Sequence, residues 1–317
     1  MPTPPEPSSP AIDVRESRKG LFYGLAAYLS WGLAPAYYHL LQDVAPIQIL
    51  AHRIFWSALF LLPLVAYRRL WGDVARALRN RRTLLTLIAS TLFITANWYT
   101  FIYAVSVNRV MESALGYYMN PLVVVLLGVV FLKERLRPWQ VISLALAAAA
   151  VAILTLAQRQ LPVISLVLAV SFALYGLLRK TVDAGPLVGL FIETLILLPL
   201  TAGLIGVDVA RQGLHWSATT YALLAGAGIV TAVPLLWFAN AARRLRLATL
   251  GLLQYLAPTC SFLVAVIVLH EPFTGAQKIA FPMIWAALAL YSIDSYRAFR
   301  AAVRPAPMDV EPVLTDL

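Results

Sequence analysis

The sequence predicts an all-α integral membrane protein with ten transmembrane helices, arranged as two inverted five-helix repeats and with both termini in the cytoplasm. Three observations support this prediction. The 317 residues are 61% apolar and only 13% charged, with a mean hydropathy of +0.77, whereas soluble domains are about 25% charged. Long apolar runs recur along nearly the whole chain, and one segment is repeated 137 residues later. A soluble chain of this composition would expose large apolar patches, so most soluble enzyme classes are excluded.

Each predicted span is a run of roughly 20 mostly apolar residues, the length that an α-helix needs to cross the hydrocarbon core. No small-residue cleavage pattern follows the first run, which therefore predicts a retained helix. No connection is long enough for a soluble domain, and the longest, residues 68–82, is interpreted as a loop. The predicted spans are residues 20–40, 46–66, 83–105, 112–132, 138–157, 162–180, 186–206, 217–241, 248–269 and 275–296.

Basic residues alternate between the predicted connections. Of the 25 lysines and arginines, 20 fall in the termini and the even-numbered loops, four fall in the odd-numbered loops, and Arg53 lies within a span. Because cytoplasmic loops carry the excess of basic residues, this distribution places both termini in the cytoplasm. The net charge of +10 is therefore interpreted as a topology signal, and no nucleic-acid partner is expected.

An internal repeat relates residues 118–134 to residues 255–271 at a constant offset of 137. The repeat makes spans one to five equivalent to spans six to ten. Because five is odd, the second copy crosses the membrane in the opposite sense. Inverted repeats are typical of secondary transporters, which bind substrate between the halves. The identical pairs are Tyr118 with Tyr255, Pro121 with Pro258, Leu126 with Leu263, Val129 with Val266, Leu132 with Leu269 and Glu134 with Glu271.

Five strings within this architecture carry a family resemblance. They are AAYLSWGLAPAYY at 26–38, ILAHRIFWS at 49–57, NWYTFIYAV at 97–105, ESALGYYMNPLVVVLLGVVFLKERL at 112–136 and IETLILLPL at 192–200. The chain resembles the EamA branch of the drug/metabolite transporter superfamily, and within it the RarD subfamily, from residue 17 to about residue 300. The resemblance implies a permease of the cytoplasmic (inner) membrane. Superfamily relatives export amino acids and other small metabolites, and some carry cationic drugs.

Charged and titratable side chains inside the spans are costly in hydrocarbon, so each is a candidate for function. Arg53 in the second span is interpreted either as a contact for an anion or as an arginine that extends to the outer interface. Its neighbour His52, and Glu193 in the seventh span, are candidates for proton coupling or for structural hydrogen bonds. Because the second and seventh spans are repeat equivalents, an ion pair between Arg53 and Glu193 is one hypothesis, and binding of a cationic substrate by Glu193 is another.

Uncharged polar and aromatic side chains within the spans are predicted to line a substrate pathway. Pro121 and Pro258 each remove a backbone donor and are expected to kink their helices, which frees carbonyl groups toward the interior. Aromatic rings suit planar or cationic substrates, but tryptophan and tyrosine also form belts at membrane interfaces. With His52, Arg53 and Glu193, the predicted pathway residues are Trp31, Asn97, Trp98, Tyr118, Asn120, Gln254 and Tyr255.

Glutamates at the span ends are expected to have structural partners. Glu134 and Glu271 are expected to cap helices or pair with loop groups, and Glu112 is expected to pair with Arg109. Since Cys260 is the single cysteine, neither an intrachain disulfide nor a thiolate metal site is expected. No catalytic residue, metal or cofactor is predicted. The sequence has no glycine-rich phosphate loop with a lysine, so ATP is not expected to drive transport.

Together these features predict a secondary-active transporter that exports small organic solutes such as amino-acid-like metabolites or drugs. Access is expected to alternate between the two repeats, and coupling to protons is left open. A polytopic membrane enzyme acting on lipid-linked substrates and a membrane sensor are the alternatives. The few polar groups are scattered through the spans, which favours transport over catalysis. The expected partners are the solute, membrane lipid, protons and a second copy in a homodimer. The predicted organisation is a disordered N-terminus (1–19), two repeats (20–157 and 162–297) and a loose tail (304–317).

Overall fold

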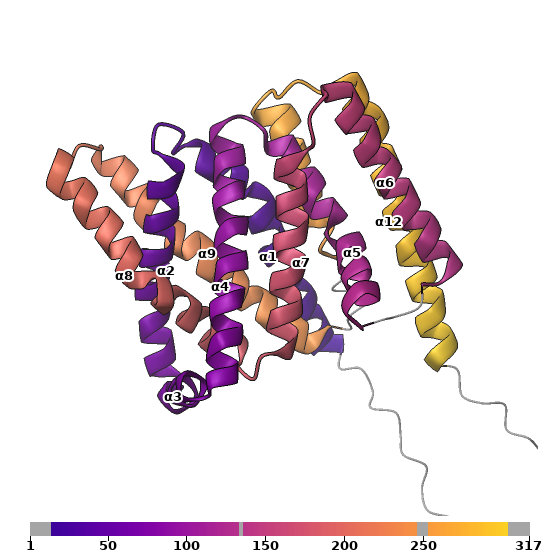
Figure 1. Ribbon diagram of the computed structural model, residues 1–317. Coiled ribbons are helices and arrows are strands. Elements are labelled where there is room, and N and C mark those ends of the chain that lie inside the picture. Colours follow the sequence, from indigo (N-terminus) through magenta and orange to yellow (C-terminus); the bar gives the residue numbers. More distant parts are fainter. Residues whose placement is uncertain (1–13, 133–135, 246–252, 304–317) are drawn as a thin grey trace, which may run out of the picture.

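The computed structural model describes residues 14–132, 136–245 and 253–303, and these residues form helices and turns without a strand. Figure 1 shows most of the helices packed side by side as a bundle. The helices are α1 (Val14–His39), α2 (Pro46–Tyr67), α3 (Trp71–Arg79), α4 (Arg81–Ser106), α5 (Val110–Leu132), α6 (Pro138–Gln158), α7 (Val163–Thr181), α8 (Pro186–Gln212), α9 (Ala218–Arg244), α11 (Leu256–Leu263), the π-helical turn η1 (Val264–Val268) and α12 (Gly275–Val303).

The helices coincide with the predicted spans. Within the described residues, six helices are long and apolar enough to cross a membrane by length and composition: α2, α4, α6, α8, α9 and α12. The segments Val163–Arg179 and Leu256–Val268 are shorter apolar helices. The ninth predicted span, 248–269, is described only from residue 253. The all-helical, multi-pass class is confirmed, while the number of ten spans and the orientation of the termini stay predictions.

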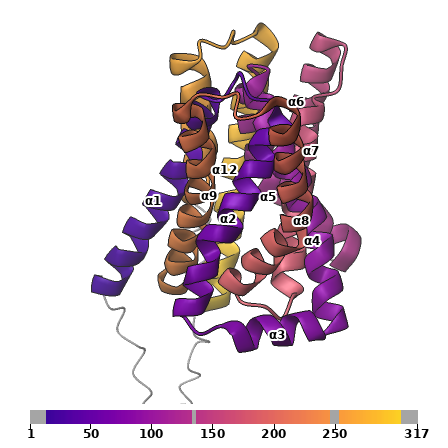
Figure 2. The ribbon, with the colours of Figure 1, turned by 90° about the vertical axis from the view of Figure 1, so that its left-hand side faces the viewer.

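The connection between the second and third predicted spans is not a simple loop, and this prediction was wrong. Residues Trp71–Arg79 form the short helix α3, whose Val74 and Ala77 are buried and whose Asp73 pairs with Arg76 at 2.8 Å. Figure 2 shows α3 lying across the end of the bundle. A search for long apolar runs misses such a helix, because its narrow apolar stripe is surrounded by arginines.

Both ends of the described chain lie at the same end of the bundle. The start of α1, the end of α12, the connection between α7 and α8, and α3 are all at the same end of the bundle (Figures 1 and 2). Six arginines lie in or beside α3, namely Arg68, Arg69, Arg76, Arg79, Arg81 and Arg82. We call this end of the bundle the arginine-rich end.

The first five long helices pack mainly against the later ones. In particular, α1 packs on α9 and α4 packs on α7. In addition, α5 packs on α7, and α11 packs on α1. Two further pairs are α2 with α8 and α6 with α12. In Figure 1 the pair α6 and α12 forms one edge of the bundle, and α8 lies at the opposite edge. The two parts of the chain are therefore interleaved and do not form separate bundles.

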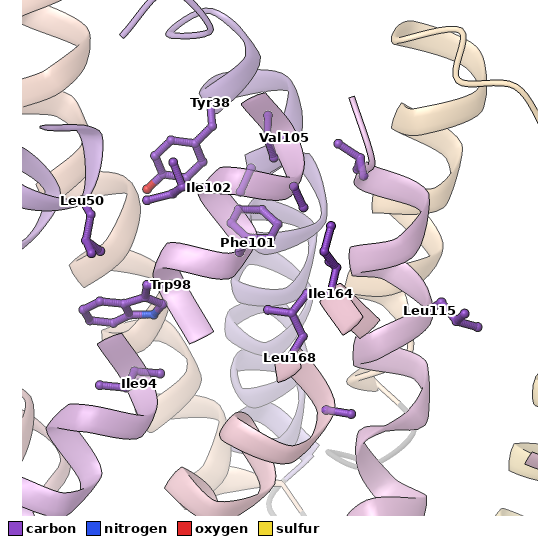
Figure 3. Close-up of a cluster of buried hydrophobic side chains, with 14 of the residues drawn as sticks. Tyr38, Leu50, Ile94, Trp98, Phe101, Ile102, Val105, Leu115, Ile164 and Leu168 are labelled. Atoms are coloured by element: carbon purple, nitrogen blue, oxygen red, sulfur yellow. The ribbon is translucent and has the colours of Figure 1, made fainter. Parts of the chain in front are cut away.

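The core includes a buried region between α1, α2, α4 and α7. Figure 3 shows Trp98, Phe101 and Ile102 on α4, with Ile164 and Leu168 of α7 on one side and Leu50 of α2 on the other. Tyr38 of α1 and Trp98 both extend toward the side on which Leu50 lies. Both rings are buried, with 2% of Tyr38 and 8% of Trp98 exposed. Both rings contact the guanidinium of Arg53 on α2.

Candidate binding site

Arg53, the eighth residue of α2, is a buried cation. Only 9% of the residue is exposed. Its guanidinium carbon lies 4.4 Å from the centre of the Trp98 ring and 5.6 Å from that of Tyr38. Among the described residues it has neither a hydrogen bond nor an ion pair, and its buried Nε is without a hydrogen-bond partner. Aromatic faces attract a guanidinium, and each such contact contributes about 2 kcal/mol where water is excluded. This attraction compensates the buried positive charge only in part.

Glu193, the eighth residue of α8, is compensated within the protein. It is 2% exposed. Ser90 of α4 donates a hydrogen bond to its Oε1 at 2.6 Å, and Tyr175 of α7 donates to Oε2 at 3.4 Å. Arg179 of α7 brings a guanidinium nitrogen within 3.8 Å of Oε1. Glu193 therefore links α8 to α4 and α7 through polar contacts.

The expected ion pair between Arg53 and Glu193 is absent, because Glu193 pairs with Arg179. The reason lies in the directions of the helices. α2 begins at the end of the bundle opposite the arginine-rich end, whereas α8 begins at the arginine-rich end (Figure 1). At a rise of about 1.5 Å per residue, the eighth residue of each helix lies roughly 10 Å from its own start. Equivalent positions of antiparallel helices are thus at different depths.

The two predicted asparagines hold helices together. Asn97 is 1% exposed, and its amide donates to the Leu168 carbonyl and to Ser171 Oγ of α7, both at 3.1 Å. The Asn97 oxygen accepts a hydrogen bond from Tyr117 of α5 at 3.0 Å. Asn120 of α5 likewise donates to a carbonyl of α7, that of Ala169, at 3.2 Å. These hydrogen bonds join α4 and α5 to α7.

The remaining predicted pathway residues are dispersed. Trp31 of α1 packs edge-on against Tyr28, with ring centres 5.4 Å apart. Tyr118 shares a hydrogen bond of 2.7 Å with Thr259 of α11. Gln254 and Tyr255 are partly buried just before α11. The structure therefore does not gather these four side chains around Arg53.

The two prolines occupy different helical positions. Pro121 lies in the middle of α5, where the missing N–H removes a helical hydrogen bond. Pro258 is the third residue of α11, in a first turn whose N–H groups have no helical acceptor. Within the described residues, Pro258 therefore stands near the start of a helix instead of in its interior.

A second polar cluster, which the sequence did not indicate, lies near the end of α8. Asp208 is 9% exposed; Gln212 donates to its Oδ1 at 3.1 Å, and His215 lies 4.0 Å from its Oδ2. His52 and Trp216 have ring centres 6.0 Å apart. The predicted span ends at residue 206, before Asp208. The spacing of four residues between Asp208 and Gln212 was the available signal that the helix continues.

Glu271 caps a helix, as expected. Its two carboxylate oxygens accept hydrogen bonds from the backbone N–H groups of Val110 at 2.5 Å and Met111 at 2.8 Å, at the start of α5. A helix N-terminus favours an anion in this position. The expected Glu112–Arg109 pair is also present, at 2.6 Å. Glu134, the repeat equivalent of Glu271, lies outside the described residues.

We expect the Glu271→Gln variant to change how stability depends on pH. Burial, and to a smaller extent repulsion from Glu112, raise the pKa of the Glu271 carboxyl although the backbone N–H groups of Met111 and Val110 act to lower it. A carboxyl with a raised folded-state pKa contributes stability that is present below its unfolded pKa of about 4.3 and is lost as the pH rises through the folded-state value. Between about pH 4 and pH 7 the melting temperature of the variant should therefore fall less than that of the unmodified protein.

Melting temperatures measured across this pH range in one detergent check the expectation. Asp43→Asn is the matched control, because it removes an exposed carboxylate from the connection between α1 and α2 and should keep the original profile. Identical slopes for Glu271→Gln and the unmodified protein contradict the expectation.

Comparisons with known proteins agree with the membrane architecture. The EamA-like transporter family matches residues 18–156. A protein of Vibrio cholerae described as an uncharacterized transporter is 40% identical over 297 residues, which are 92% of this chain and 98% of the relative. Protein RarD of Escherichia coli K12 is 39% identical, with 90% and 97% of the two chains covered. The chloramphenicol-sensitive protein RarD of Pseudomonas aeruginosa is 32% identical, with 92% and 99% covered.

One solved crystal structure has a similar fold. Its TM-score is 0.56 at 19% sequence identity, and the match covers 89% of this chain and 99% of the other. At this identity the likeness concerns the fold alone.

Proposed function

Because the chain belongs to the EamA-like transporter family and is similar to RarD proteins over most of its length, we propose that it is a secondary-active exporter of small organic solutes. Family membership makes it a membrane transporter, and its relatives are named transporters and not enzymes. The proposal adds the cargo, amino-acid-like metabolites or drugs, and the cytoplasmic membrane as its location. It also places both termini and the arginine-rich end in the cytoplasm.

The observation that carries the proposal is that exchanging the two halves of the chain preserves several of the most extensive helix contacts. The contact of α1 with α9 has its repeat equivalent in the contact of α7 with α4. Likewise, the contact of α5 with α7 has its equivalent in the contact of α11 with α1. α2 and α6 each pack on their own counterparts, α8 and α12. This pattern supports two inverted repeats related by a pseudo-two-fold axis, one of which rocks against the other to alternate access.

Two titratable clusters on α8 support coupling to protons. Glu193 and Asp208 are 15 residues apart, which at about 1.5 Å per residue separates them by roughly 22 Å along the helix. Glu193 lies toward the arginine-rich end, and Asp208, with His52 and His215, lies toward the opposite end. A proton taken up at one cluster and released at the other would couple the proton gradient to export.

Reconstitution of the purified full chain in liposomes tests the proposal. With an imposed pH gradient, saturable flux that depends on the protein is expected for members of a panel of amino acids, amphenicols and cationic dyes. Collapsing the gradient with a protonophore should lower this flux at least tenfold. Flux that survives the collapse contradicts proton coupling, and the absence of flux for every compound contradicts the proposed cargo.

A further inference from the structure

We infer that Arg53 is the recognition site for a carboxylate group of the transported solute, so that the cargo is an organic anion or a zwitterion. This inference rests on the proposed function, since it assigns a substrate class to the transporter. It concerns a small region of the bundle, in which the guanidinium of Arg53 on α2 contacts the rings of Trp98 on α4 and Tyr38 on α1.

The charge of Arg53 lacks an anionic partner in the described part of the chain. A buried charge is stable only when it is paired and hydrogen-bonded, and removal of its partner is strongly destabilising. The aromatic rings of Trp98 and Tyr38 attract the cation but accept none of its N–H groups in a conventional hydrogen bond. A bound carboxylate would supply both the negative charge and the acceptor oxygens that are missing.

The equivalent position of the second repeat also carries a buried charge. Glu193 occupies the same position of α8 as Arg53 does of α2, and there the protein supplies the opposite charge itself, through Arg179 near the end of α7. Near the end of α1, the counterpart of α7, the residue beside Arg53 is Tyr38. The protein therefore neutralises one of the two equivalent charges and leaves the other to an external partner.

Further polar atoms at the site lack partners. In the described part of the chain, the Tyr38 hydroxyl is buried without a hydrogen-bond partner, as is Arg53 Nε, and Tyr38 is only 2% exposed. Buried polar atoms are normally hydrogen-bonded, so two unsatisfied atoms on side chains in contact indicate a missing partner. A guanidinium presents its N–H groups as a planar fork that matches the two oxygens of a carboxylate.

The test compares benzoate with benzamide, which have nearly the same shape but differ in charge. The full chain is purified in a neutral detergent without anionic lipid, and its thermal unfolding is followed at increasing probe concentration. A ligand that binds only the folded state raises the melting temperature. We expect benzoate to act at concentrations at least tenfold lower than benzamide. Equal responses to the two probes, or no response to benzoate, overturn the inference.

Variants assign the effect to Arg53. Arg53→Gln and Arg53→Met should abolish the difference between the probes, and Arg53→Met should raise the melting temperature of the ligand-free protein because it removes an unpaired buried charge. Arg79→Gln, which removes an exposed arginine from the end of α3, should keep the full response to benzoate. A full response to benzoate in Arg53→Gln overturns the inference. It is also overturned if ligand-free Arg53→Met melts at a lower temperature than the unmodified protein, because Arg53 is then a structural arginine.

Two further measurements do not depend on the folding of Arg53 variants. Benzoate should change the tryptophan fluorescence of the unmodified protein, and this change should be absent from Trp98→Phe; an unaltered change in Trp98→Phe overturns the inference. Inorganic phosphate is the second probe, and a response to phosphate without one to benzoate overturns the carboxylate assignment in favour of a phosphate-bearing ligand.

Flux measurements separate this inference from the proposed function. Benzoate binding that depends on Arg53, without flux of benzoate or any panel compound in liposomes, supports the site and contradicts the exporter. Saturable flux of neutral or cationic compounds that is unchanged in Arg53→Gln supports the exporter and overturns the carboxylate site.

Discussion

Replacing Gly228 by alanine is expected to lower the free energy of unfolding by about 2 kcal/mol and to reduce solute flux at least tenfold. At Gly228 of α9 the backbone of α2 approaches so closely that an added Cβ would lie 2.6 Å from the carbonyl carbon of Trp56 and 2.7 Å from the amide nitrogen of Ser57. Backbone atoms cannot move aside as a flexible side chain does, so α2 and α9 must separate. Overpacking costs about 1–3 kcal/mol, of which at most about 1 kcal/mol is offset by the higher helix propensity of alanine.

The loss of flux follows from the position of the contact on α2. Arg53 lies three residues before Trp56, about one helical turn away, so a displacement of α2 also displaces the guanidinium from Trp98. Unfolding in mixed detergent micelles measures stability, and liposome flux measures transport. The control is Gly206→Ala in α8, where an added Cβ meets no atom within 4 Å and stability should be unchanged or slightly higher. Equal stability of the two variants contradicts the prediction.

Replacing Arg179 by methionine is expected to cost about 3 kcal/mol of stability, because Glu193 is then a buried carboxylate without a cation. Ser90 and Tyr175 still donate hydrogen bonds to it, but neither carries charge. Adding Glu193→Gln to this variant should recover most of the loss, since an amide needs only hydrogen-bond partners. Gly189 allows the contact, because a Cβ there would overlap the Arg179 guanidinium.

A double-mutant cycle in mixed micelles measures the coupling between the two residues. Arg76→Met is the control, because it breaks the exposed pair with Asp73, and exposed pairs contribute about 0–1 kcal/mol. Additive effects of Arg179→Met and Glu193→Gln show no coupling and contradict the ion pair.

The spans were predictable because their stability in a membrane depends mainly on length and composition. Nearly the whole of α2, residues Pro46–Tyr67, is recovered by its apolar run, 46–66. The amphipathic helix α3 was missed because its stability comes from Val74 and Ala77 packing on the bundle. The last turns of α8 were missed for a related reason, since Asp208 interrupts the apolar run although it is buried in the fold.

The sequence identified the charged side chains but not their partners. A buried arginine and a buried glutamate at equivalent positions predicted a pair, yet antiparallel helices place these positions at different depths. The capping role of Glu271 was correctly predicted. The helix that it caps, α5, begins 161 residues earlier at Val110, so the sequence did not indicate which helix this would be.

By itself, the sequence determined that this protein is a helical, multi-pass membrane protein of the EamA-like family, because apolar length, basic-residue distribution and family motifs are local properties of the chain. The tertiary structure decided which charges are compensated. It brings Arg179 to Glu193, whereas among the described residues it brings aromatic rings and no anion to Arg53, through contacts between different helices. The energetic cost of a buried charge depends on what lies within a few ångströms of it, and that is set by helix packing.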